Sequence, residues 1–239
     1  MTKNAILVAT ERSGTNFFLD VYAQIVPNSL AFREIFRSRG DSFVDVKKLT
    51  GFGQERTMDL TLNEPLTLWQ TMERDAAQMD HTVIAKIFYD HAPNHPDLWR
   101  YLRDNNRVVH LIRRNPFNAL LSRHVANQVK KWRQEKQDAI VPTPTPFELP
   151  RQRVEIYCAW HKEQVEMTRS FFAGADFHEV FYEDIGKNDQ SCADAVSRIT
   201  GVAIPPGGIA SNLVKQKRFT NEDILTNYDD LRDLDQYTY

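Results

Sequence analysis

Residues 10–16, Thr-Glu-Arg-Ser-Gly-Thr-Asn, have the types and the order that a phosphate-binding turn requires. Gly14 lets the backbone approach a ligand, and Arg12 supplies a planar cation that suits phosphate oxygens. Further side-chain donors come from Ser13, Thr15 and Asn16. An apolar run at residues 5–9 precedes the segment and helix-period apolar residues follow it, so the segment connects a strand to a helix. Because the first amides of a helix are unpaired and its dipole favours an anion, the segment predicts a phosphate site.

An ordinary strand–helix turn is the alternative interpretation of this segment. In that case Ser13 or Thr15 caps the helix, and Arg12 is a solvated surface charge. The segment lacks the first glycine and the lysine of the phosphate loop of nucleotide triphosphatases. It also lacks the Gly-x-Gly-x-x-Gly pattern of dinucleotide-binding proteins. The turn alone therefore leaves both interpretations open.

A second basic cluster, at the end of another strand, favours the anion-binding interpretation. Residues 107–112 form a buried-strand pattern that runs into Arg113 and Arg114. Ser122 follows Arg114 by eight positions, two turns into the next helical pattern. Parallel strands bring their carboxyl ends to one edge of a sheet, where α/β proteins bind ligands. We therefore expect two anion sites to share one edge.

Three segments in this order resemble the sulfotransferases that use 3′-phosphoadenosine 5′-phosphosulfate (PAPS). In that family an Arg/Lys-Ser/Thr-Gly-Thr loop binds the 5′-phosphosulfate, and residues 12–15, Arg-Ser-Gly-Thr, match it. A later arginine, with a serine eight residues on, binds the 3′-phosphate, and Arg114 and Ser122 match this pair. Residues 181–184, Phe-Tyr-Glu-Asp, resemble a family turn whose tyrosine packs against adenine, which implicates Tyr182. The resemblance spans residues 5–185 and implies PAPS as the co-substrate.

The arginine of the loop resembles the bacterial carbohydrate and tyrosyl-protein members more than the cytosolic phenol type, which has a lysine there. The late Arg-Lys-Gly-x-x-Gly motif of the cytosolic type is absent. Residues 215–218, Lys-Gln-Lys-Arg, instead resemble the basic closing segment of bacterial members. The resemblance therefore implies that Lys217 or Arg218 reaches the 3′-phosphate.

Glu34 is the first candidate for the general base. Sulfuryl transfer passes through a loose, in-line transition state, so positioning and charge stabilisation, here by Arg12 and the helix-start amides, outweigh covalent chemistry. The acceptor hydroxyl then needs a base, and in bacterial and tyrosyl-protein sulfotransferases this is a glutamate at a similar distance after the loop. The alternative is a surface glutamate that pairs with Arg33 or Arg37.

Lys86 and His91 are further candidates for the catalytic site. Lys86 lies within an otherwise apolar strand pattern, and a sulfate would pair with an ammonium that is costly to bury alone. The two residues resemble the Lys/His region that cytosolic members use near the sulfate, which makes His91 the second candidate base. Alternatively, Lys86 points to solvent at the strand edge and His91 starts a turn. The other histidines show no metal-ligand spacing, and the reaction requires no metal.

An alternation of strands and helices must position these residues. Strand patterns cover residues 5–9, 82–88, 107–112 and 177–181. Helical patterns cover residues 14–26, 66–79, 94–102, 116–132, 152–172 and 191–200, and a capping signature begins at Thr220. This order predicts the α/β class, a three-layer sandwich with a central, mainly parallel sheet and a P-loop-like nucleotide site.

Length and composition favour one domain over residues 1–239, because 41% hydrophobic residues suffice for a single core. The 30 basic and 32 acidic side chains leave a net charge of −2, so no global field draws the chain to nucleic acid. Four prolines at residues 140–150 predict a surface loop or lid over residues 136–150. Two unpatterned cysteines and the absence of a long apolar run predict a cytoplasmic protein without a membrane anchor.

The acceptor is the least determined part of this interpretation. A hydroxyl on a carbohydrate or another small metabolite fits best, and Trp132 and Trp160 are expected in the core, not in a sugar platform. Two other functions remain: a small-molecule or nucleoside kinase, and a non-catalytic nucleotide-binding protein. A kinase would need a Walker lysine and magnesium-binding acids, and neither is placed convincingly. The sequence leaves the oligomeric state open.

Overall fold

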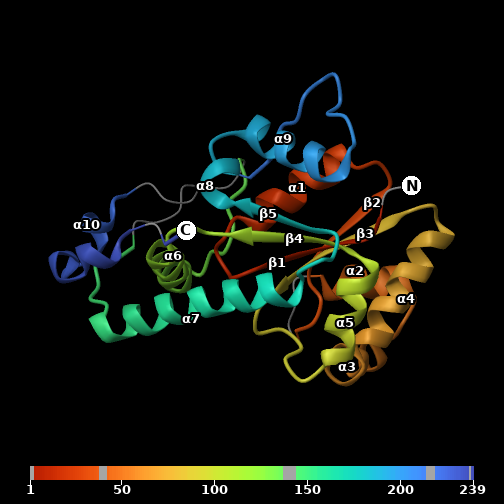
Figure 1. Cartoon of the computed structure of the whole chain (residues 1–239), viewed down its shortest axis with the longest axis horizontal. Helices are drawn as coiled ribbons and strands as arrows, with labels where there is room; N and C mark the ends of the chain where they lie inside the picture. The colour runs from red at the N-terminus through yellow and green to blue at the C-terminus, as the bar shows by residue number, and fades with distance from the viewer. Residues whose placement is uncertain (1–2, 38–41, 137–143, 214–218, 237) are drawn as a thin grey trace.

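Among the described residues, five parallel strands form a central sheet in the order β2-β3-β1-β4-β5 (Figure 1). The computed structural model describes residues 3–37, 42–136, 144–213, 219–236 and 238–239. The strands are β1 (Ala5–Ala9), β2 (Ser29–Glu34), β3 (Thr82–Phe88), β4 (Arg107–Ile112) and β5 (Phe177–Phe181). β1 is buried along its whole length and pairs with β3 on one side and β4 on the other. The first apolar run of the sequence is therefore the centre of the sheet.

Helices cover both faces of this sheet. They are α1 (Thr15–Ile25), α2 (Phe43–Thr50), α3 (Gln54–Asn63), α4 (Pro65–Gln78), α5 (Pro96–Asn105), α6 (Pro116–Val129), α7 (Arg151–Phe171), α8 (Tyr182–Ile185), α9 (Asp189–Thr200) and α10 (Asn221–Ile224), followed by the 3₁₀ helix η1 (Tyr228–Leu234). Helices α1 and α9 lie on one face, and α4 and α5 lie on the other (Figure 1). The predicted three-layer α/β sandwich with a parallel sheet is confirmed.

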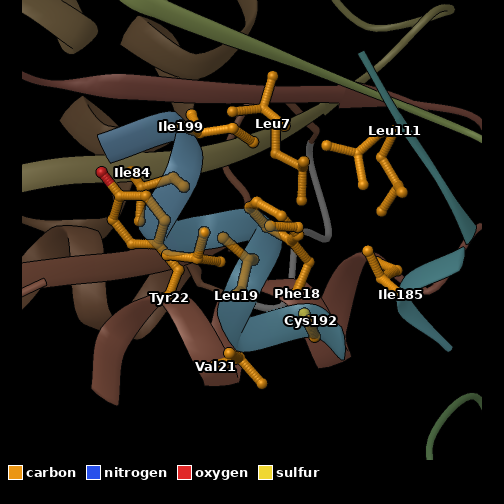
Figure 2. Packing of buried hydrophobic residues seen from close by; sticks show 14 of the residues in the cluster. Leu7, Phe18, Leu19, Val21, Tyr22, Ile84, Leu111, Ile185, Cys192 and Ile199 are labelled. Carbon is orange, nitrogen blue, oxygen red and sulfur yellow. The ribbon is translucent and has the colours of Figure 1, made fainter. Parts of the chain in front are cut away.

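The alternation of side chains along β1 divides the core between the two faces. Leu7 belongs to the cluster with Phe18 and Tyr22 of α1 and Cys192 of α9 (Figure 2). Ile6 and Val8 belong to the opposite cluster, which contains Leu68, Trp69 and Met72 of α4. Because both faces are covered, a strand with apolar residues at every position is stable at the centre of the sheet.

The elements β2, α2 and α3 were not expected from the sequence. β2 is an edge strand in which only Phe32 is fully buried, so it lacks the continuous apolar run of an interior strand. The buried residues of α3 are Thr57, Leu60 and Thr61, so its apolar periodicity is weak. The strands and helices that the sequence predicted are present, with ends shifted by a few residues at most.

The described part of the predicted lid, residues 136 and 144–150, contains no helix or strand of its own. Phe147 pairs with Leu225 in a single bridge and stacks on His124 of α6 with ring centroids 4.2 Å apart. Leu149 is completely buried. Residues 144–150 are therefore packed against α6 and the C-terminal elements, within a third apolar cluster.

The two cysteines, Cys158 of α7 and Cys192 of α9, are both free thiols. Burial raises the pKa of Cys158 to about 11 and the pKa of Cys192 further. Neither side chain is therefore a reactive thiolate at neutral pH. In the part of the chain that the structure describes, no helix has the length and apolar character to cross a bilayer.

The turn between β1 and α1 has a backbone that few residue types tolerate. Arg12 and Gly14 both have positive φ angles, +67° and +82°. A Cβ atom on Gly14 would lie 2.6 Å from Cδ2 of Tyr182, closer than carbon atoms can approach. Because Tyr182 opens α8, the turn after β5 closes on the turn after β1. The missing side chain of Gly14 is therefore what allows the two turns to meet.

Replacing Gly14 tests this contact. Gly14→Ala and Gly201→Ala both place a Cβ at a left-handed residue, with φ +82° and +73°, but only the first meets a neighbour within 4 Å. We expect Gly201→Ala to lower the free energy of unfolding by about 1 kcal/mol. Gly14→Ala should lower it by roughly 1–3 kcal/mol more, because the tyrosine ring must move. Equal losses for the two variants in urea denaturation would show that the contact contributes nothing.

Candidate active site

The start of α1 lies at the carboxyl edge of the sheet and keeps hydrogen-bond donors available. Its N-cap is Gly14, which has no side chain to cap the helix, and its first turn contains no acidic residue. Ser13 is completely buried, and its Oγ has no hydrogen-bond partner among the described residues. The alternative in which Ser13 caps the helix is therefore not what the structure contains. An anion at this helix start would meet unpaired amides and the positive end of the dipole.

The side chain of Arg12 is held by α6 and by the segment that follows it, both far from the turn in the sequence. Its Nε donates to Ser122 Oγ of α6 at 3.0 Å, and its Nη1 donates to the carbonyl oxygen of Trp132. Its guanidinium carbon also lies 5.9 Å from the centre of the Trp132 ring. Trp132 itself is 46% exposed, so the expectation that it is a core residue is wrong. The Trp132 ring lies beside the Arg12 guanidinium and is partly exposed to solvent.

Arg113 is a second cation beside the turn, and it was not among the site residues predicted from the sequence. Only 9% of the residue is exposed, and its Nη1 donates to the backbone oxygen of Arg12 at 2.9 Å. Its Nε is buried with no hydrogen-bond partner among the described residues. Burial, together with the neighbouring Arg113, lowers the pKa of Arg12 to about 10. The sequence did contain a signal for Arg113, because two adjacent arginines follow β4. The family pattern of an arginine with a serine eight residues later matches Arg114 only.

Arg114 contacts the third predicted segment. Its guanidinium donates two hydrogen bonds to Asp184, at 2.8 and 2.9 Å, and lies 4.0 Å from the centre of the Phe181 ring. Its backbone amide donates to Glu183 Oε2 at 3.0 Å. Ser122, its expected partner at the 3′-phosphate, accepts from Arg12 instead. The turn after β5 thus holds Arg114 with two acids.

Tyr182 connects the turn after β1 with the arginines after β4. Its ring lies against Gly14, and the guanidinium carbon of Arg113 lies 4.8 Å from the ring centre. The three segments that carried the resemblance therefore converge at one edge of the sheet. Lys217 and Arg218 lie outside the described residues, and their predicted contact with a phosphate remains a prediction.

Lys86 links the turn to the candidate base. Its Nζ donates to Asn16 Oδ1 at 3.0 Å and lies 3.2 Å from Glu34 Oε1. Only 3% of Lys86 is exposed, so the alternative in which it points to solvent is wrong. The other carboxylate oxygen of Glu34 accepts from Arg37 at 2.9 Å, which is the partner that the alternative interpretation of Glu34 named. Glu34 thus pairs with Arg37 and at the same time faces the turn through Lys86.

The two candidate bases differ in their protonation. Burial acts to raise the pKa of Glu34, but the charges of Lys86 and Arg37 outweigh it, and the pKa lies below its ordinary value. His91 is 3% exposed, and burial lowers its pKa to about 4. Its Nδ1 accepts a hydrogen bond from the amide of Phe88, so the neutral ring carries its proton on Nε2. At neutral pH Glu34 is therefore an ionised acceptor, whereas His91 presents a neutral N–H donor.

Across the described residues, no group of three or more His, Cys, Asp or Glu side chains is placed to hold a metal ion. The side chains that gather at the carboxyl edge are instead arginine and lysine around donors of the turn, with one glutamate beside them. This set can bind an oxyanion and accept a proton close to it.

Comparison with known proteins bears on the family and the fold of this chain. A family model described as a sulfotransferase domain matches residues 2–227, and no curated protein matches the chain. The sulfotransferase domain from the curacin biosynthetic pathway superposes with a TM-score of 0.51 at 10% identity, over 85% of this chain and 76% of that one. The sulfotransferase domain of the Synechococcus PCC 7002 olefin synthase gives a TM-score of 0.46 at 14% identity, over 84% of this chain and 74% of that one. The tunicamycin resistance protein of Deinococcus radiodurans gives a TM-score of 0.47 at 15% identity, over 85% of this chain and 99% of that one.

The curacin-pathway domain shares the fold of this chain, and the family model covers nearly all of its length. The three segments that the sequence pattern singled out lie within the matched residues and meet at one edge of the sheet. The chain belongs to the sulfotransferase family.

Proposed function

We propose that this sulfotransferase takes its sulfuryl group from PAPS and transfers it to a hydroxyl of a carbohydrate or another small metabolite. The observation that carries the proposal is the buried positive charge at the turn after β1. The half-buried Arg12 lies there beside the buried Arg113, whose charge adds to the effect of burial in lowering the pKa of Arg12. A phosphate group would offset this repulsion and give hydrogen-bond partners to Ser13 Oγ and Arg113 Nε, which are buried without one among the described residues.

The surrounding side chains suit the parts of PAPS in turn. The helix-start amides, Ser13 and Arg12 would hold the 5′-phosphosulfate, with Thr15 and Asn16 at the same helix start. Arg114 and Ser122 would hold the 3′-phosphate, and Tyr182 would pack against adenine. Arg114 must exchange Asp184 for the phosphate in this scheme. The Asp184 side chain is 53% exposed, and such a pair contributes only about 0–1 kcal/mol, so the exchange costs little.

The reaction needs one bond exchange and one proton transfer. The acceptor oxygen forms a bond to sulfur while the bond between sulfur and the 5′-phosphate oxygen breaks. The proton of the acceptor hydroxyl passes to Glu34, and the products are the sulfate ester and adenosine 3′,5′-bisphosphate (PAP). Lys86 lies between the turn and Glu34, where its ammonium would stabilise charge on the sulfuryl oxygens.

Glu34 suits the role of base better than His91. Its carboxylate is ionised at neutral pH, and a carboxylate with two partners still has lone pairs for a hydroxyl proton. His91 uses its lone pair at Nδ1 for the amide of Phe88, so its Nε2 carries a hydrogen and donates. In this scheme His91 supplies a hydrogen bond near Glu34 and takes no proton.

Binding of PAP tests the proposed donor. At about 100 times its dissociation constant, PAP should raise the free energy of unfolding by about 2.7 kcal/mol, and ATP with magnesium should raise it less. Arg114→Ala should weaken PAP binding by roughly 10- to 100-fold in calorimetric titration, because a charged hydrogen-bond partner is lost. Arg56→Ala removes an exposed arginine of α3 and is the control, with unchanged binding. A larger stabilisation by ATP with magnesium would favour a kinase, and unchanged binding in Arg114→Ala would remove the 3′-phosphate assignment.

The role of Glu34 predicts both a rate and a pH profile. Glu34→Gln should lower kcat about 10²- to 10⁴-fold and leave PAP affinity nearly unchanged. Because the pKa of Glu34 lies below 4.5, its ionised fraction falls only in acid, and kcat/KM of the parent should stay level from neutral pH down to that range. Glu163→Gln, on the exposed side of α7, should behave like the parent. Transfer by Glu34→Gln at the parental rate, or an acid limb near pH 6.5, would contradict the assignment.

A further inference from the structure

A cavity of about 190 Å³ lies beside the proposed catalytic residues, between the carboxyl ends of β1 and β3 and the helices α6 and α7. It is lined by Thr10, Glu11, Phe88, Tyr89, Asp90, Arg123, Tyr157 and Trp160. We infer that this cavity is the acceptor pocket and that it takes one neutral sugar ring, an inference that rests on the proposed sulfuryl transfer. Its volume corresponds to about six water molecules and is below the roughly 300–1,000 Å³ of sites for drug-sized ligands.

One wall of the cavity is aromatic. The ring of Trp160 lies 6.2 Å from Tyr89 and 5.5 Å from Tyr157, measured between centroids, so the three rings are contiguous. All three residues are half-buried, and Trp160 is therefore a pocket residue and not the core residue that its sequence context predicted. The faces of aromatic rings carry negative charge density, which attracts the positively polarised C–H groups of a sugar ring.

The aromatic wall is held in place by a chain of polar groups that begins at the buried His110 and continues through the half-buried Glu179 and Arg169. The hydroxyl of Tyr89 lies 2.7 Å from Nε2 of His110, and Nδ1 of His110 lies 3.1 Å from Glu179. Arg169 completes the chain with two hydrogen bonds to Glu179, at 2.8 and 3.2 Å. On the other side, the hydroxyl of Tyr157 lies 3.4 Å from Thr10 Oγ1. Rings fixed in this way lose little conformational entropy when a ligand binds.

The opposite wall is polar and favours a neutral ligand. Glu11 pairs with Arg123 at 3.0 Å and with Arg37 at 3.2 Å, so its charge is already matched. Asp90 is exposed, and the structure gives its carboxylate no hydrogen bond or ion pair within the described residues. An acidic acceptor would meet two carboxylates here, whereas sugar hydroxyls can donate to them and accept from Arg123.

The cavity is joined to the proposed base through one guanidinium. Nη1 of Arg37 lies 3.2 Å from Oε1 of Glu11 and 2.9 Å from Oε2 of Glu34. The polar wall of the cavity is thus next to the residue that would take the proton, and Glu11 immediately precedes Arg12 of the turn. A ring in the cavity would present a hydroxyl toward the region between the base and the sulfuryl group.

Transfer of labelled sulfate from PAPS to methyl α-glucoside, methyl β-galactoside and methyl α-mannoside, with 2-naphthol as the phenolic comparison, tests the inference. The parent should sulfate at least one glycoside in preference to 2-naphthol. Trp160→Leu should raise KM for that glycoside about tenfold or more, with kcat and PAP affinity nearly unchanged, because it removes an acceptor contact and no donor contact. Ile156→Ala changes a 62% exposed residue of the same helix, outside the cavity, and should match the parent.

A second readout does not depend on turnover. With PAP bound, the glycoside should change the tryptophan fluorescence of the parent, and Trp160→Leu should lose that change. A parental KM in Trp160→Leu, or a preference for 2-naphthol, would overturn the pocket assignment. So would a parent that binds PAP but sulfates none of the glycosides. Failure of the proposed function itself would look different, because the parent would then bind no PAP.

Discussion

Repulsion between the half-buried guanidinium of Arg12 and the buried guanidinium of Arg113 is the constraint on which the candidate site depends. Arg12 and Arg113 come from different strand ends, and a hydrogen bond of 2.9 Å from one side chain to the backbone of the other holds them together. Burial and the nearby charge of Arg113 lower the pKa of Arg12, and burial lowers the pKa of Arg113. Folding therefore assembles a positive site whose natural complement is an anion. The left-handed backbone of Arg12 adds local strain at the same point.

The turn after β5 stabilises this arrangement from the opposite side. Tyr182 packs on Gly14 and under Arg113, while Glu183 and Asp184 contact Arg114. One short segment thus fixes the aromatic face and supplies the acids that offset part of the charge. Because Asp184 is half-exposed, its pairing with Arg114 contributes little to stability, and the proposed exchange for a phosphate would cost little. The same contacts that organise the fold also leave the site able to exchange partners.

The proposed donor and acceptor sites meet at Glu34. Lys86 connects this carboxylate to Asn16 of the turn, and Arg37 connects it to Glu11 of the cavity. A carboxylate with a cation on each side stays ionised in this partly buried place. The sheet order accounts for the placement, since β2 lies next to β3 and both end at the edge where β1 begins its turn. The helix α7 then closes the cavity with Tyr157 and Trp160.

The sequence alone determined the interior strands β1, β3 and β4, the edge strand β5, the turn after β1 and the segments that resemble sulfotransferases. The interior strands were recognisable because a buried parallel strand must be apolar, and the residues that follow such strands must reach the same edge. The sequence did not reveal the edge strand β2, which has one fully buried residue. It selected Arg114 by spacing and passed over Arg113, and it placed Trp132 and Trp160 in the core. Tertiary structure decided which arginine turns inward, which carboxylate meets Lys86 and which aromatic rings line a cavity. Each of these depends on distances between residues far apart in the chain, which packing fixes and local pattern does not.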